Sequence, residues 1–600
     1  MRTARVSTLL CVAVAVVFAR PLFVSCAEGA CRLIADRGGE TEDGRQFLLM
    51  WEAARVSLFD FAQFPSWNPY HCGGVVHWLD PQVPFPGPLF LALAWLPSAA
   101  GIKLWILVHL VAGALGVRAL SRDAGAGAGG QVLCAALVCC GGTVAEHLGG
   151  GQLWFAPFLL FPWALWAQRR AARDARYAVP VAAVLALAVV EGGIYPAPFM
   201  LIALLLDAGS TLLLTPHRRG VVRALAVTAV CAPLLAAVKL LPVLAFLLLH
   251  PRKVALDDAM SLHEVLLALT ARAHDRYFPG HPYVWPEYAS YVGAVPVALM
   301  LAGAALALAR PFRRPREHDR STARPADLEP TPAEAADRTA GARDLLLCAG
   351  LVWLAMGDAR PSAFRALHAL PIFDSLHVPS RFLFLSVAAG ALLAVRALAE
   401  LAALVARRAE RWAGPLAAAQ VALALAVAAD LSTVNAPRLQ QGLDPPLPRQ
   451  RASAAFFQEQ SANYDLVAFH PVIGMGTTRC YGGFAWPVSR SLWFGRGPQE
   501  RLEPSGAGDL TELRWSPSAI TVRARLREMA LVVVNQNFDL GFHASAGTIG
   551  SIDGLLAVQL PPGDHTVVLA HRSAGLVEGT ILSLCGLALS FALLRVLKPR

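Results

Sequence analysis

Charged side chains are scarce in this 600-residue sequence, at 16% of the chain, whereas 56% of its residues are hydrophobic. A soluble globular chain is usually about one-quarter charged, so the shortage excludes a simply soluble protein. Apolar runs of about 18 or more residues recur along the chain, which is the length of a membrane-spanning helix. The formal net charge of +10 then fits basic loops on one side of a membrane, and we expect no nucleic-acid partner.

Several motifs that would indicate a particular chemistry are missing. The sequence has no glycine-rich phosphate loop of the Walker type, which argues against ATP hydrolysis. It has no CxxC pair and no Cys/His spacing typical of a metal site, and residues 28–86 contain no DxD triplet. We therefore predict no certain cofactor, and a divalent metal stays possible but unsupported. An internal repeat, which is common in transporters, is also absent from the sequence.

About twelve apolar segments are predicted to span a membrane. The first runs from Val6 to Ala27, and we interpret it as an uncleaved helix rather than a signal peptide because Arg20-Pro21 interrupts the run. The others lie near 102–120, 130–146, 152–168, 177–193, 196–214, 223–248, 289–310, 343–357, 381–405, 413–431 and 575–596.

Basic segments give the predicted orientation of these helices. If the N-terminus is cytoplasmic, the segments 168–176, 216–223, 310–320 and 407–411 all fall on the cytoplasmic side, as does the C-terminal tail. This agrees with the positive-inside rule. We therefore expect a multi-pass protein of a bacterial-type inner membrane, with both termini in the cytoplasm.

The predicted fold is a mainly α-helical polytopic membrane protein with a C-terminal extracytoplasmic β-rich domain. Its parts are a transmembrane domain at 1–431, outer loops at 28–86 and 249–288, a disordered cytoplasmic linker at 315–342, the β-rich domain at 432–574, and a final helix with a cytoplasmic tail at 575–600. Cysteines in or beside the outer segments permit a disulfide. Cys31 with Cys72 is a plausible pair, but Cys26 and Cys480 are also available and the sequence does not fix the connectivity.

The β-rich domain is predicted from alternation. In "AITVRARL" (519–526), Ile520, Val522, Ala524 and Leu526 face one way, while Thr521, Arg523 and Arg525 face the other. The segments 531–538, 555–560 and 565–571 also read as strands, and "PPGD" before the last of them reads as a turn. The length suits one small β-sandwich.

The outer segments carry a series of motifs whose order is informative. "ETEDGRQF" (40–47) is followed by "PSWNPYHCGG", "DPQ", "GGTVAEHLGGGQLWFAPFLLFPWALW" (141–166), "KLLPVLAFLLLHPRK" (239–253), "WPEYASYVGAVPVAL" (285–299), "HVPSRFLFL" (377–385) and "VVVNQNFDLGFHASAG" (532–547). In this order they resemble GT-C superfamily membrane glycosyltransferases, specifically the YfhO-like family. Each motif is loose by itself, and the resemblance covers almost the whole chain.

The resemblance implies a transfer reaction at the outer membrane surface. Such enzymes move a sugar from a polyprenyl-phosphate donor to a glycan, lipid or protein acceptor, and use an aspartate of the first outer loop. That role falls on Asp43, although Asp36, Glu40 and Glu42 compete for it. A carboxylate within hydrogen-bond reach of a hydroxyl can remove its proton as the new bond forms. A donor with a polyprenyl tail in the membrane lipid would present its phosphate at this depth.

Further candidates for substrate or donor contacts lie at outer helix ends. They are Asp80, His147, Glu191, Lys239, Glu287, Tyr288 and Arg381. Lys239 and Arg381 are cations that could bind the donor phosphate, although long basic side chains can also reach out to the interface. Asp80 could instead cap a short helix, and Tyr288 could anchor a helix at the interface.

Two other functions remain open from the sequence. A transporter or flippase of lipid-linked glycans would place polar residues near the middle of the bilayer, and Lys239 favours it. A non-catalytic protein of envelope assembly would use the β-rich domain to bind partners. The acids cluster in outer loops rather than inside helices, which favours the glycosyltransferase.

Overall fold

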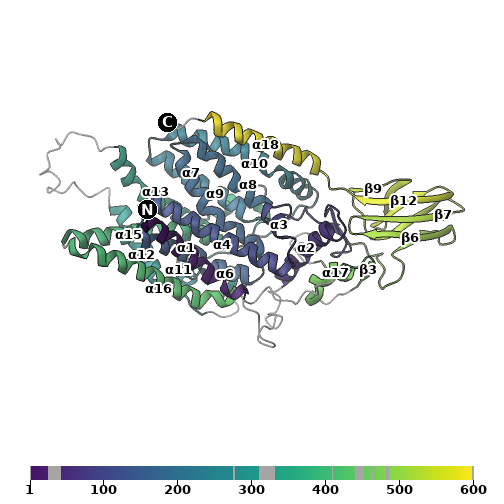
Figure 1. Ribbon diagram of the computed structural model, residues 1–600, viewed down its shortest axis with the longest axis horizontal. Coiled ribbons are helices and arrows are strands. Elements are labelled where there is room, and N and C mark those ends of the chain that lie inside the picture. Colours follow the sequence, from purple (N-terminus) through teal and green to yellow (C-terminus); the bar gives the residue numbers. More distant parts are fainter. Residues whose placement is uncertain are drawn as a thin grey trace.

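The computed structural model describes residues 2–23, 42–273, 278–309, 332–408, 410–439, 452–460, 464–480 and 486–597. This part of the chain forms an elongated helical bundle with a β-domain at one end, and both chain ends lie toward the opposite end (Figure 1). Most of the predicted linker 315–342 lies outside the described residues. Its last part is helical, because α13 begins at Pro332.

Eight helices of the described chain are long and apolar enough to cross a membrane. They are α1 (Arg2–Ala19, continued by Arg20–Phe23), α4 (Ser98–Asp123), α5 with α6 (Ala128–Cys139 and Gly142–Gly149), α9 (Pro196–Leu214), α10 (Arg218–Leu249), α15 (Phe382–Arg408), α16 (Ala413–Leu439) and α18 (Leu576–Val596). Two shorter apolar helices are α8 (Ala178–Val190) and α12 (Ala294–Ala309). The protein is thus mainly helical, as predicted, but the count of about twelve spans is not confirmed.

Two of the predicted spans differ for identifiable reasons. The segment 152–168 is divided into a 3-10 helix, Leu153–Leu160, and α7 (Phe161–Ala171). Pro157 lies inside the first piece, and a proline cannot donate the backbone hydrogen bond that a continuous α-helix needs. The segment 343–357 belongs to α13 (Pro332–Ala355), whose first turns are polar.

The bundle has a buried centre and a lipid-like periphery. The α5–α6 span and α15 are almost entirely covered by other helices, whereas α16 and α18 are mostly exposed. Helix α18 packs along α10 on the outside of the bundle, and its uncovered side carries Ile581, Leu584 and Phe591. Such an apolar outer face suits a helix that contacts lipid.

The first outer segment, predicted as a long loop over 28–86, contains helices and a hairpin in its described part. An 18-residue helix, α2 (Glu42–Phe59), begins at the acidic cluster. A short hairpin of β1 (Trp67–Asn68) and β2 (Val75–Val76) follows, and then the six-residue helix α3 (Pro88–Leu93). Two more short helices, α11 (Leu262–Thr270) and α14 (Ala363–His368), lie in the later outer segments.

The C-terminal β-domain consists of two four-stranded antiparallel sheets. One has the order β10–β11–β8–β5 and the other β6–β7–β12–β9. Their bounds are β5 (Glu500–Glu503), β6 (Gly508–Ser516), β7 (Ala519–Leu526), β8 (Ala530–Asn537), β9 (Phe542–Ala544), β10 (Thr548–Ile552), β11 (Leu555–Leu560) and β12 (Gly563–His571). The four predicted strands are confirmed. The alternation in β7 is also confirmed, with Val522 buried and Arg523 exposed.

The sheets occupy less of the chain than the predicted domain did. Helix α16 continues to Leu439, past the expected boundary at 432, and the strands of the two sheets begin only at Glu500. Between them lie a short parallel pair, β3 (Phe457–Glu459) and β4 (Met475–Thr477), and the four-residue helix α17 (His470–Ile473).

The β-domain holds the first outer segment from the side away from the bundle. The Asn537 side chain at the end of β8 donates to the backbone oxygens of Cys72 and Gly74, at 2.6 and 3.0 Å. Cys72 forms a disulfide with Cys480. The plausible pair of Cys72 with Cys31 was therefore wrong. Its actual partner is 408 residues away, and only the fold brings them together.

A buried acid lies where the two sheets meet. Glu500 of β5 is 7% exposed, and one of its carboxyl oxygens has no hydrogen-bond partner among the described residues. Burial, and then the neighbouring Glu512 carboxyl of β6, raise the pKa of Glu500 to about 8. The folded domain therefore holds a proton that the unfolded chain releases at lower pH.

This carboxyl makes the domain sensitive to alkaline conditions. Because the pKa of Glu500 is higher in the folded state, the free energy of unfolding falls as pH rises from about 5 to about 8. Glu500→Gln should flatten this dependence, which the thermal midpoint of the detergent-solubilised protein would report. Glu503→Gln, an exposed neighbour paired with Arg501, is the matched control. An unchanged pH dependence in Glu500→Gln would contradict this assignment.

Candidate active site

The start of α2 makes a close backbone contact with the turn at 149–152, which follows α6 and is called the second outer turn below. Asp43 lies in the first turn of α2 and is partly buried. A Cβ atom built on Gly151 would lie 2.3 Å from the Gly44 nitrogen and 3.3 Å from the Asp43 carbonyl carbon. Gly151 also has φ +85°, which L side chains rarely adopt. Only glycine allows this approach, which places Asp43 beside the "HLGGGQLW" motif.

The structure says little about the other acids that are candidates for the general base. Asp36 and Glu40 lie outside the described residues, and Glu42 is the first residue of α2. Which of them acts as the base therefore stays a prediction.

An ion pair joins two of the other predicted residues. Glu287 ends a short 3-10 helix, Trp285–Glu287, and Arg381 ends another, Pro379–Arg381, just before α15. The Arg381 Nη2 atom donates to both carboxylate oxygens at 3.0 and 2.8 Å, and its Nε atom donates at 3.1 Å. Arg381 is only 2% exposed, so the pair is screened little by water.

Two residues of the second outer turn complete the neighbourhood of Glu287. The Gln152 amide donates to its carboxylate at 2.7 Å, and the His147 Nε2 atom lies 3.3 Å away. His147 is oriented by its other ring nitrogen, which donates to the Thr143 carbonyl oxygen at 2.8 Å. Burial alone would raise the pKa of Glu287, but Arg381, and then His147 and Gln152, lower it well below the usual range. Glu287 is thus a carboxylate.

The Arg381 guanidinium still has a free donor. It lies over the rings of Trp154 and Tyr195, at 4.5 and 4.2 Å from their centroids. Its Nη1 atom is buried and makes no hydrogen bond of good geometry among the described residues, although the Tyr195 side chain lies close enough to interact with the same guanidinium. A buried donor without a good hydrogen bond is costly, and an anionic ligand would satisfy it.

A neutral histidine, His377, which the sequence analysis did not single out, lies next to the Arg381 site. The His377 Nδ1 atom lies 2.7 Å from the Tyr195 hydroxyl and 3.4 Å from the Arg252 guanidinium. Because arginine only donates, this nitrogen accepts. Burial, and then Arg381, lower the pKa of His377 to about 3. The next residue, Val378, has φ +57°, and such strain in a β-branched residue is often found at functional sites.

Glu191 lines a small cavity next to this region. The cavity encloses about 180 Å³ of empty space, any open solvent included. Its walls are Phe47, Trp51, Gln82, Pro84, Trp105, Leu153, Trp154 and Glu191. The Glu191 carboxylate accepts from the Leu89 backbone N–H at 3.0 Å and from the Trp105 indole at 2.6 Å. These contacts tie α3 and α4 to the end of α8.

Lys239 and Asp80, which were predicted to contact the substrate, make hydrogen bonds within the protein instead. The Lys239 ammonium donates to the carbonyl oxygens of Trp78, Asp80, Val83 and Phe85, at 2.8 to 3.2 Å. The Asp80 carboxylate accepts from the Gln82 backbone N–H. We predicted that Lys239 could bind the donor phosphate. Its N–H groups already donate to carbonyl oxygens of the first outer segment, so we now interpret Lys239 as a structural residue.

Tyr288 points away from its neighbour Glu287. Its hydroxyl donates to the Asp258 carboxylate at 3.0 Å. The ring of His281 lies between Asp258 and Glu264, at 3.1 and 3.2 Å from their oxygens. This is a separate polar network within the outer segment. In the described part of the chain, no three His, Cys, Asp or Glu side chains form a group that could hold a metal ion.

The Glu287–Arg381 pair should be strongly coupled. Removing either partner leaves the other charge buried without its partner, so Glu287→Gln and Arg381→Gln should each lower the free energy of unfolding strongly. The double variant should lose less than the sum of these two losses. We expect a coupling energy of roughly 1–3 kcal/mol from a double-mutant cycle in SDS unfolding titrations. The exposed pair Asp358–Arg365 is the control, with coupling below about 1 kcal/mol. Equal coupling in the two pairs would refute the buried assignment.

Comparison with known families and curated proteins does not name this site. No family model matches it, and no curated protein matches it. The function proposed next therefore rests on the geometry described above and on the motifs of the sequence.

Proposed function

We propose that the protein is a membrane glycosyltransferase of the GT-C type. It transfers a sugar from a polyprenyl-phosphate donor to an extracytoplasmic glycan, lipid or protein acceptor, and Asp43 is its general base. The observation that carries the proposal is the contact of Gly44 with Gly151. It brings the backbone of Asp43 against Gly151, and the next residue, Gln152, donates to the Glu287 carboxylate of the Glu287–Arg381 pair.

The Asp43 carboxylate and the Arg381 guanidinium suit the attacking and the leaving group of an inverting displacement. The Asp43 carboxylate removes the proton from the acceptor hydroxyl while the acceptor oxygen bonds to the anomeric carbon. The bond from that carbon to the phosphate oxygen breaks, and the polyprenyl phosphate leaves as an anion. Arg381 has an unused donor for that anion, and a guanidinium is well suited to phosphate. One carboxylate is enough, because a phosphate needs little acid assistance to leave.

The position along the bundle supports an extracytoplasmic site. The Cys72–Cys480 disulfide lies beside the β-domain, because Asn537 of β8 donates to the Cys72 carbonyl oxygen, and structural disulfides persist in oxidising compartments. At the other end, Arg118 donates to the Ala4 carbonyl oxygen and Arg170 pairs with Asp123. Basic residues thus gather near the N-terminus, as expected for a cytoplasmic face. An inner membrane of bacterial type, with the site facing outward, is the corresponding location.

The transporter alternative loses its main support. Lys239 was the cation that favoured it, but its ammonium is satisfied by four loop carbonyls. It is therefore a fixed structural group rather than one available to a moving substrate.

Asp43→Asn should abolish transfer while leaving the protein folded. Loss of a general base typically costs about 10²- to 10⁴-fold in rate. The measurement is mass spectrometry of envelope glycans in a strain lacking the gene and complemented with each variant. Asp257→Asn, an exposed acid of another outer segment, is the matched control and should restore the glycan fully.

Variants of the competing acids make the test specific. Asp36→Asn, Glu40→Gln and Glu42→Gln should each retain transfer if Asp43 is the base. Full complementation by Asp43→Asn would eliminate this residue, and loss in one of the others would move the role to it. If labelling showed that residues 36–80 are exposed to the cytosol, the proposal would be wrong, because the reaction needs them on the outer side of the membrane.

A further inference from the structure

Within the described chain, helix α11 has two apolar faces, and the protein covers one of them. The covered face consists of Val265, Ala268 and Leu269, which are buried. The uncovered face carries three exposed leucines, Leu262, Leu266 and Leu267. A helix that borders water usually turns polar residues outward, so contact with water does not explain this face. The three leucines have no part in the proposed transfer site.

The end of α11 adjoins the apolar helix α12 (Figure 1). The Ser290 backbone N–H donates to the Ala268 carbonyl oxygen, and the Gly293 N–H donates to the Leu269 carbonyl oxygen, both at 3.1 Å. Helix α12 begins at the next residue, contains no charged side chain, and exposes Val295 in its first turn. The uncovered face of α11 therefore lies next to a surface that suits lipid.

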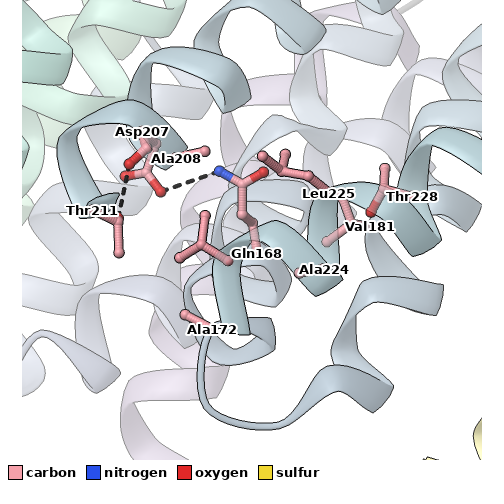
Figure 2. A pocket seen from close by; sticks show the side chains of 10 residues that line it. Gln168, Ala172, Val181, Asp207, Ala208, Thr211, Ala224, Leu225 and Thr228 are labelled. Carbon is pink, nitrogen blue, oxygen red and sulfur yellow. Dashed lines mark hydrogen bonds between the residues drawn. The ribbon is translucent and has the colours of Figure 1, made fainter. Parts of the chain in front are cut away.

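Charged groups inside the bundle are enclosed by protein. Asp207 of α9 is 1% exposed, and its carboxylate accepts from the Gln168 amide at 3.2 Å and from the Arg169 guanidinium at 2.8 Å. Figure 2 shows the Gln168 amide pointing toward this carboxylate. Such enclosure is expected, because a charge that faces hydrocarbon is costly.

An ion pair just beyond α11 is not enclosed in this way. The Arg272 guanidinium lies 2.9 Å from the Asp430 carboxylate of α16, and 60% of the Arg272 side chain is exposed. The Tyr291 hydroxyl donates to the same carboxylate at 2.7 Å. Tyrosines and exposed charges are typical of the level where the hydrocarbon gives way to the headgroups. The pair therefore indicates that α11 ends near this boundary.

A polar edge separates the two apolar faces of α11. The Glu264 carboxylate accepts from the Ser261 backbone N–H at 2.6 Å, and its other oxygen lies 3.2 Å from the His281 Nε2 atom. The helix thus has protein on one side, leucines on another and a polar network at the edge between them. This is the pattern of a helix that lies in the plane of a membrane interface.

We propose that α11 is an interfacial helix whose leucine face contacts lipid acyl chains of the leaflet on the side of the candidate site. The partner of this surface is the lipid hydrocarbon. The hydrogen bonds to Ala268 and Leu269 join the helix to residues 290–293, which closely follow Glu287. The leaflet thereby sets the depth of the segment that carries Glu287. The inference goes beyond the glycosyltransferase proposal and does not depend on it.

The test uses the full chain in lipid vesicles. Leu266→Cys carries a fluorophore, in a background from which the reactive native cysteines, such as the exposed Cys585, have been removed. Its fluorescence should be lost to lipids with a nitroxide on the acyl chain and should be retained with iodide on both sides of the vesicles. Because an interfacial helix buries its apolar face only about 5–10 Å deep, a nitroxide near the glycerol end should quench more than one near the methyl end.

Two exposed apolar residues provide matched controls. Val295→Cys on α12 should be quenched by the nitroxide lipids, whereas Leu513→Cys on β6 of the β-domain should be quenched by iodide. Quenching of Leu266→Cys by iodide would overturn the proposal, because the leucine face would then lie in water. Protection from both quenchers would also overturn it, because protein would then cover the face. Stronger quenching from the methyl end would overturn the interfacial position.

A second measurement tests whether lipid contact holds the helix in place. Leu262→Glu with Leu266→Glu makes the face polar, so amide hydrogen exchange over 262–270 in lipid nanodiscs should become faster by roughly tenfold or more. Leu513→Glu is the matched control and should leave this exchange unchanged. An unchanged rate in the double variant would contradict the proposed contact, because the leucines would then contribute nothing to the stability of α11.

Discussion

The burial of one ammonium group organises the end of the molecule that carries the candidate site. Lys239 lies within the long helix α10 and is completely buried. A buried cation without partners would cost several kcal/mol, and the first outer segment offsets part of that cost by turning four carbonyl oxygens toward it. The segment is thereby fixed to a membrane helix from below, while Asn537 of the β-domain holds it from above.

Other buried charges near this end follow the same rule, and their partners are distant in sequence. Arg381 is neutralised by Glu287, 94 residues earlier, and Glu191 accepts from Trp105, 86 residues earlier. Each contact links two parts of the chain that lie far apart in the sequence. The polar groups therefore fix the relative positions of the segments, and the apolar helices provide only the frame.

The parts of the fold and of the candidate site that could be predicted are those marked by a periodic pattern of apolar residues in the sequence. The alternation from Ala519 to Leu526 identified β7 correctly, because strand burial repeats every two residues. Helix α2 was missed because its buried face includes Arg45 and Glu52, so no apolar stripe marks it. Lys239 was misinterpreted because its partners are backbone carbonyls, which no side-chain pattern records. Its four ligands can be recognised only once the fold is known.

The helical setting of Asp43 changes how the β-domain relates to the proposed chemistry. Phe47 and Trp51 lie one and two turns beyond Asp43 on α2 and line the aromatic cavity, so the proposed base and the cavity share one rigid element. The same helix packs against residues 464–473, just before the sheets. A site built on a helix is held more precisely than one on a loop. The segment leading into the β-domain thus supports the helix that carries the proposed base, and the domain belongs to the framework of the proposed site.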